Sequence, residues 1–202
     1  MKIYIIRHGA TSWNSSGRWQ GTTDIPLNDE GRAQSAAVAE RLSRNGIAAV
    51  YSSVLERAYE TAEIIAEKCG VSVIKNPLLA EIDLGKWEGK TISEIEILED
   101  FKEWETSPDL APHGGESYNE VKKRMVEAIT EAAERENGDF AVVSHGGAIR
   151  AFFCYVLGLE VVFRFKFKLA NASLTVINYD KENKEFTLET FNDYGHLEMN
   201  DN

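Results

Sequence analysis

The sequence predicts an α/β fold: a three-layer α/β/α sandwich with a mostly parallel central sheet. Short apolar runs rich in β-branched residues alternate along the chain with segments of helical period. Strands that alternate with helices form parallel sheets covered on both faces. No low-complexity tract, internal repeat or Pro/Ser-rich linker divides the 202 residues. We therefore expect one domain over residues 1–202, with a small helical excursion at about 88–116.

The first elements follow from apolar runs and capping residues. Residues 2–6 are short, apolar and β-branched, which is typical of a buried strand. After a long polar loop, Asn28 can cap a helix that begins with acidic residues and is expected to stop at Gly46. Residues 48–53 are the next expected strand.

Two Ser-x-x-Glu patterns predict helix starts. They are Ser53 with Glu56 and Ser117 with Glu120. The helix after the first box is expected to end at Gly70 and the helix after the second near Gly138, because glycine is the preferred residue just past a helix end.

The remaining strands are predicted from apolar runs. Residues 71–74 and 139–144 resemble buried strands, and 172–180 with 185–191 resemble a closing hairpin around the polar turn "KENK". Between 160 and 169 phenylalanines alternate with basic residues, as in a strand, but a helical turn fits equally.

Composition limits the function classes. Lys and Arg number 22 and Asp and Glu 33, which gives a net charge of −11 and argues against nucleic acid or an anionic membrane as partner. Cys69 and Cys154 are too few and too far apart for a disulfide framework or a zinc site. The apolar start is too short for a signal peptide, so we expect a cytoplasmic protein with free thiols. A homodimer is compatible with the sequence.

Two histidines lie just beyond the ends of expected strands. His8 comes after "IYII" and His145 after "AVVS". Ligands of parallel sheets bind outside the carboxyl ends of the strands, so neighbouring strands would bring both imidazoles to one crevice. Arg7 lies beside His8, and Arg57 lies in the first turn of the helix after another strand. With His145, if protonated, these arginines would form a cationic cup suited to phosphate.

A family resemblance becomes specific at these residues. The ordered stretches are "RHGATSWN", "GRWQGTTDIPLNDEG", "SSVLERAYETA", "LAEIDLGKWEG", "GGES" and "VVSHGG". Over nearly the whole chain they resemble the histidine phosphatase superfamily, also named the phosphoglycerate mutase-like family. The resemblance implies the fold of this family, an α/β/α sandwich, and a mechanism that passes through a phosphohistidine.

The resemblance implies a role for each matching residue. His8 is the expected nucleophile, and Gly9 is expected to leave room for the phosphate. Arg7, Arg57 and His145 would hold the three non-bridging oxygens. Further phosphate or substrate contacts are expected at Asn14, Gln20, Gly21 and Gly146. We also expect His113 near the substrate entrance, and His196 in the tail.

Glu81 matches the family's general acid. It would protonate the departing alkoxide and later accept a proton from the attacking water. Asp83 and Glu88 are nearby alternatives that are more typical of hydrogen-bonding or surface carboxylates. The arginines and His145 supply the positive charge, and no residues have convincing metal-ligand spacing. We therefore expect neither a metal nor a cofactor.

Hydrolysis of a small phosphorylated metabolite is favoured over mutase activity. The mutases of this family carry a longer, arginine-containing insertion after the acid, whereas residues 88–115 are short, acidic and without arginine. "GRWQGTTDIPLNDEG" and "NDYGHL" resemble α-ribazole phosphatases and broad-specificity phosphatases, and phosphoserine is another candidate substrate. The alternatives are a cofactor-dependent phosphoglycerate mutase and, more remotely, an inactive module that binds phosphorylated ligands.

Overall fold

The central sheet has six strands in the order β3-β2-β4-β1-β5-β6. The structure is a computed structural model, and the description below concerns residues 1–198. The strands are β1 (Lys2–Arg7), β2 (Val50–Ser52), β3 (Val73–Lys75), β4 (Phe140–Ser144), β5 (Leu174–Asp180) and β6 (Glu185–Asp193). The first four are parallel, and the predicted hairpin β5-β6 adds two antiparallel strands beside β1. The mostly parallel sheet predicted from the sequence is therefore confirmed.

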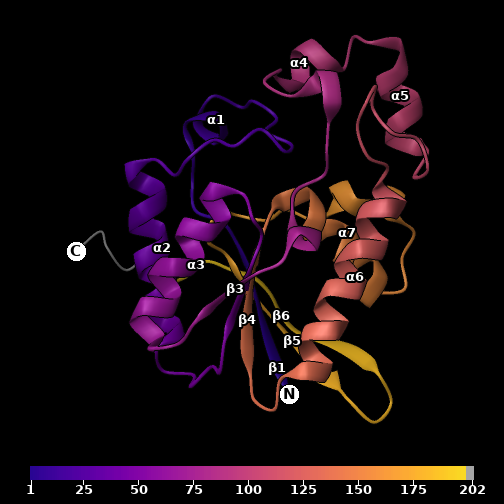
Figure 1. Ribbon diagram of the computed structural model, residues 1–202. Helices are drawn as coiled ribbons and strands as arrows, with labels where there is room; N and C mark the ends of the chain where they lie inside the picture. The colour runs from indigo at the N-terminus through magenta and orange to yellow at the C-terminus, as the bar shows by residue number, and fades with distance from the viewer. Residues whose placement is uncertain (199–202) are drawn as a thin grey trace.

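Helices cover both faces of the sheet, which gives the expected three layers (Figure 1). Helices α2 (Asp29–Leu42) and α3 (Glu56–Cys69) lie on one side, and α6 (Tyr118–Arg135) and α7 (Gly146–Val156) on the other. Successive side chains of β1 point to opposite faces of the sheet and so belong to two separate core clusters. Ile3 and Ile5 belong to the buried cluster that contains residues of α6 and α7, and Ile6 to the one that contains residues of α2 and α3.

Three of the predicted capping residues act as caps. The Asn28 side chain accepts from the amide of Gly31, Ser117 and Glu120 form a capping box, and Gly70 ends α3 in the left-handed conformation. The Ser53–Glu56 box is wrong, since α3 begins only at Glu56. Ser53 instead accepts from the amide of Leu55, and the amide of Glu56 donates to Asp24 at 2.7 Å.

Two further segments differ from the sequence-based expectation. Helix α2 ends at Leu42, before the expected stop at Gly46. The ambiguous segment 160–169 forms the 3₁₀ helix η3 (Val161–Lys166) rather than a strand. Both cysteines are free, with Cys154 buried and Cys69 only partly so. Within residues 1–198, no helix has both the length and the apolar character needed to cross a membrane.

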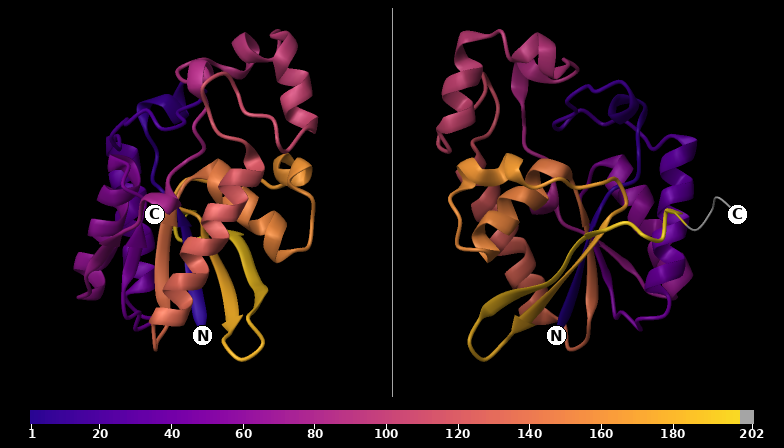
Figure 2. Two further views of the ribbon diagram at one scale, coloured as in Figure 1. Left: turned by 45° about the vertical axis from the view of Figure 1, so that its right-hand side comes forward. Right: turned by 180° about the vertical axis from the view of Figure 1, so that it is seen from behind.

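Short elements gather beyond the carboxyl ends of the parallel strands, opposite the N-terminus (Figures 1 and 2). They are α1 (Ser12–Ser15), η1 (Pro77–Leu79), η2 (Gly85–Trp87), α4 (Ile92–Ile95) and α5 (Glu99–Thr106). Helices α4 and α5 occupy the expected excursion and stand farthest from the sheet. Trp87 and Trp104 pack edge to face with ring centroids 5.0 Å apart, which anchors this excursion to the core.

Candidate active site

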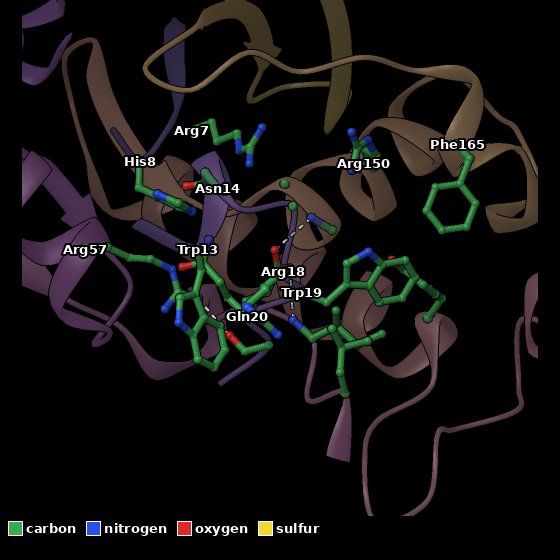
Figure 3. Close-up of a pocket in the computed structure, with 18 residues that line it drawn as sticks. Arg7, His8, Trp13, Asn14, Arg18, Trp19, Gln20, Arg57, Arg150 and Phe165 are labelled. Atoms are coloured by element: carbon green, nitrogen blue, oxygen red, sulfur yellow. Dashed lines mark hydrogen bonds between the residues drawn. The ribbon is translucent and has the colours of Figure 1, made fainter. Parts of the chain in front are cut away.

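A pocket of about 370 Å³ lies at this edge of the sheet. Its walls come from the end of β1, the loop through α1, the first turn of α3, the loop that carries Glu81, the start of α7, and single residues of α6 and η3. In Figure 3, Arg7, His8 and Arg57 lie at one end and Arg150 and Phe165 at the other. The pocket therefore has a cationic end around His8 and a second region with both charge and aromatic surface.

His8 has its tautomer fixed by the backbone. Its Nδ1 lies 2.7 Å from the carbonyl oxygen of Gly9, and a carbonyl can only accept, so Nδ1 carries the proton. This leaves Nε2 unprotonated in the neutral ring. Burial, and then the charges of Arg57 and Arg7, hold the pKa of His8 well below its usual value. His8 is therefore a neutral imidazole with a free nitrogen, as a nucleophile requires.

Gly9 has a different role from the one expected. A Cβ at this position would lie 2.3 Å from the carbonyl oxygen of Gly31, in the first turn of α2. The missing side chain therefore allows the residues after β1 to pack closely against α2. The expectation that Gly9 makes room for phosphate is wrong. The amide of Gly9 donates to Thr61 at 3.1 Å, which fixes the same turn.

The His145 ring lies beside that of His8, with centroids 5.1 Å apart. The parallel pairing of β1 with β4 makes these strands neighbours, a condition that the sequence left open, and so brings the two residues together. Burial lowers the pKa of His145 well below its usual value, and the charge of Arg57 lowers it further. Burial therefore favours the neutral form of His145, and the permanent positive charge beside His8 comes from the arginines. Neither ring nitrogen has a hydrogen-bond partner in the described chain.

Arg7 and Arg57 supply the positive charge beside His8. Arg7 donates to the carbonyl of Leu169 at 2.6 Å, and Arg57 donates to those of Thr23 and Gly21 at 2.9 and 2.7 Å. In both side chains Nε is buried and has no partner within residues 1–198. Burial, followed by the nearby Arg150, lowers the pKa of Arg7 to about 10, so it stays charged at neutral pH. Buried, unpartnered N–H groups are suited to bind phosphate oxygens.

Glu81 is held by the beginning of α7. Its carboxylate accepts from the amides of Gly147 and Ala148 at 3.0 and 2.8 Å and from its own neighbour Ile82 at 3.0 Å. A helix N-terminus favours a carboxylate in this position. Arg124 donates to the Glu81 carbonyl at 3.1 Å and so positions the backbone as well.

The alternative carboxylates serve other roles. Asp83 accepts from the amide of Gly85, and Glu88 accepts from the loop at Thr22 and Thr23. Of these three acidic residues, Glu81 is the one that lines the pocket. The expectation from the sequence that Glu81 carries the acid role is thus compatible with its location.

The other predicted contacts divide into two groups. Asn14, Gln20, Gly21 and Gly146 line the pocket, and Gln20 Oε1 is buried without a partner in the described chain. His113 does not line it, because its exposed side chain faces Asp100 at 3.3 Å on the excursion.

His196 does not behave as a tail residue. It is buried, with a ring nitrogen 3.0 Å from the carbonyl of Ala172. The described residues contain no group of three or more His, Cys, Asp or Glu side chains that could hold a metal ion.

The sequence reasoning missed part of the lining. Arg150 and Arg18 add positive charge, and aromatic surface comes from Trp13, Trp19, Tyr118 and Phe165. Arg150 could have been found, because it lies in α7 soon after β4 just as Arg57 lies in α3 soon after β2. Arg18 and the aromatic residues carry no such positional signal.

Comparison with known proteins gives consistent matches. The sequence model of the histidine phosphatase superfamily (branch 1) matches residues 3–194. Phosphoserine phosphatase 1 of Hydrogenobacter thermophilus is 36% identical over 90% of this chain and 88% of its own. A probable phosphoglycerate mutase of Cronobacter sakazakii is 33% identical over 98% and 95%. The crystal structure of a mutant phosphoserine phosphatase from Entamoeba histolytica with phosphoserine has a TM-score of 0.86 and 32% identity, covering 97% of this chain and 98% of that one.

Proposed function

We propose that this chain, which belongs to the histidine phosphatase superfamily, is a metal-independent phosphomonoesterase. The proposed reaction passes through a phosphohistidine at His8. The observation that carries the proposal is the contact of His8 Nδ1 with the Gly9 carbonyl at 2.7 Å. It leaves Nε2 unprotonated beside two arginines whose Nε groups have no partner within the described residues. A phosphate ester bound there meets a nucleophile and the charges that neutralise it.

The first half-reaction transfers the phosphoryl group to the enzyme. His8 Nε2 attacks phosphorus in line, the bond from phosphorus to the ester oxygen breaks, and the Glu81 carboxyl donates a proton to the departing oxygen. Arg7 and Arg57 bind the non-bridging oxygens and stabilise the charge spread over them in the transition state. The products of this step are an alcohol and phosphohistidine.

The second half-reaction returns the enzyme to its starting form. Water attacks the phosphohistidine and gives a proton to the Glu81 carboxylate, the bond from phosphorus to Nε2 breaks, and inorganic phosphate leaves. His145, with both ring nitrogens unpartnered in the described chain, can bind an oxygen of the transferring group. Binding of an anionic phosphate favours its protonated form, which donates more strongly.

The outer part of the pocket favours a substrate whose alcohol carries an anionic group. Arg150 lies on the pocket wall. Its Nε donates to the Phe167 carbonyl at 2.8 Å, and its guanidinium makes no other hydrogen bond within residues 1–198. A carboxylate suits such a fork. Phosphoserine has this chemistry, and relatives named phosphoserine phosphatase support it as a candidate. α-Ribazole 5′-phosphate, suggested by sequence motifs, remains a second candidate.

A phosphoglycerate mutase is the second candidate function, because relatives carry that name and the arginines of the outer pocket suit an anion. The acidic helix α5 near the site, with Glu99 and Asp100 in its first turn, argues against holding a second phosphate. The test is to supply 3-phosphoglycerate with trace bisphosphate and follow the products. Free phosphate supports the proposal, whereas 2-phosphoglycerate without free phosphate would reverse it.

Hydrolysis itself is tested with p-nitrophenyl phosphate in excess chelator. We expect turnover to persist in chelator and to disappear in His8→Ala. A screen of phosphoserine, 3-phosphoglycerate and α-ribazole 5′-phosphate then ranks the substrates by kcat/KM. A wild-type protein inactive on all of them would contradict the proposal and favour an inactive phosphate-binding module.

A further inference from the structure

Glu88 lies outside the pocket but makes five hydrogen bonds to its supporting loops. Oε1 accepts from the Thr22 amide at 2.7 Å, the Thr22 hydroxyl at 3.1 Å and the Leu84 amide at 3.3 Å. Oε2 accepts from the Thr23 amide at 2.9 Å and from the Thr23 hydroxyl. One half-buried carboxylate therefore fixes consecutive residues of the loop 20–24 and joins them to the loop that carries Glu81.

The same loop holds the guanidinium of Arg57. The carbonyls of Gly21 and Thr23 accept from its Nη2 and Nη1 at 2.7 and 2.9 Å, so the two contacts of Arg57 flank the contacts that Glu88 makes with Thr22 and with the Thr23 amide. The far end is fixed by Asp24, which accepts from the Glu56 amide at the start of α3. Arg57 is itself the second residue of α3, so loop and helix form one support.

The glycine at position 21 matches this arrangement. A Cβ there would lie 2.0 Å from Glu88 Oε1, and the backbone has a φ of +52°, which L side chains rarely adopt. The loop is therefore shaped to admit the carboxylate of Glu88 against its backbone. An ordinary surface carboxylate requires no such space.

We propose that Glu88 is a positioning residue for phosphate: it fixes loop 20–24 so that two loop carbonyls orient Arg57 with its Nε toward the pocket. This inference rests on the proposed function only in assigning phosphate to Arg57. Glu88 itself does not line the pocket. Its effect on phosphate binding passes through Arg57, and this distinguishes it from a residue that merely stabilises the fold.

A double-mutant cycle on the binding of inorganic phosphate tests whether Glu88 acts through Arg57. Isothermal titration calorimetry is performed on wild type, Glu88→Ala, Arg57→Ala and the double variant. We expect each single substitution to weaken phosphate binding by about tenfold or more, the loss of one hydrogen bond to a charged group. In the Arg57→Ala background, Glu88→Ala should weaken binding by less than about twofold. Independent, multiplying losses would overturn the proposal.

Glu94 provides a matched control. It also accepts from a backbone amide and a hydroxyl, those of Thr91 at 2.8 and 2.9 Å, and it lies in the same excursion. Glu94→Ala should leave phosphate affinity unchanged. An equal loss in Glu94→Ala and Glu88→Ala would show a general effect of the excursion and refute the specific role of Glu88.

Two further measurements keep the test decisive. Glu88→Gln keeps the shape but replaces one acceptor by a donor, so it serves if the alanine variant fails to fold, and Arg57→Gln serves in the same way. A wild type that binds phosphate but does not hydrolyse p-nitrophenyl phosphate would refute the proposed function while the cycle still reports on Glu88. A hydrolysing wild type with an additive cycle would refute only the positioning role.

Discussion

A methyl group at Gly147 should disable the acid without touching the nucleophile. This residue lies in the first turn of α7, where its amide donates to Glu81 Oε2 at 3.0 Å. A Cβ added at Gly147 would lie 2.7 Å from Glu81 Oε1, and ordinary van der Waals contact begins at 3.4 Å, so the carboxyl must retreat by about 0.7 Å. Displacements of roughly 1 Å in a catalytic group can cost about 100-fold in rate.

Gly147→Ala is expected to lower kcat on phosphoserine by roughly 10- to 100-fold. The loss on p-nitrophenyl phosphate should be much smaller, because p-nitrophenolate leaves without a proton. Glu81→Gln should show the same selectivity.

Gly138→Ala is the matched control. The new Cβ would meet only the Ala48 side chain at 3.5 Å, an ordinary contact, so both activities should stay at the wild-type level. Thermal melting checks that each variant is folded. Equal losses on the two substrates in Gly147→Ala, or no loss on either, would refute the assignment of Glu81 as the acid placed by α7.

Three other predictions concern the phosphate end. His8→Ala should abolish both turnover and the acid-labile phosphorylated protein seen by intact mass spectrometry after substrate mixing; persisting phosphorylation would exclude His8 as nucleophile. Inorganic phosphate at 100 times its Kd should stabilise the protein by about 2.7 kcal/mol in thermal or urea unfolding, and Arg7→Ala should lose most of this gain. Burial holds the pKa of His8 and His145 below the pKa of histidine in the unfolded chain. The unfolded state therefore binds more protons than the folded state below about pH 6.5. The free energy of unfolding should fall there by up to about 1.4 kcal/mol per pH unit for each histidine. Urea unfolding of wild type and of His145→Gln at pH 7 and pH 5 checks this, and equal pH dependence in both would contradict it.

Local signals in the sequence were sufficient for the sheet and the reactive centre. Strand β1 could be predicted because its apolar run stops at Arg7 and His8, and parallel strands end at one edge, but which strand lies beside β1 could be learned only from the structure. Glycine and side-chain caps predicted several helix ends. The Ser53 box failed because the chain continues extended to Leu55, and Asp24, distant in sequence, takes over the amide of Glu56.

Properties that depend on tertiary packing could not be predicted in this way. The neutrality of His145 comes from complete burial beside Arg57, and the sequence contains no measure of burial at that depth. Gly9 faces α2 rather than the pocket because of how Gly31 approaches it. The position of the Arg18 charge in the outer part of the pocket depends on the course of an irregular loop. Hydrophobic periodicity does not describe such a loop.

The position of β1 in the sheet also determines when the site can assemble during synthesis. Ile5 pairs with Val142 on one side and with Thr175 on the other, so β1 pairs only with strands that are synthesised much later than β1 itself. The carbonyl of Leu169 that holds Arg7 arrives equally late. Pairings this distant in sequence form slowly. A nascent chain that stops before β5 therefore lacks the antiparallel neighbour of β1, the strand that leads to His8, and a ribosome-stalled fragment ending there should bind phosphate more weakly than the full chain.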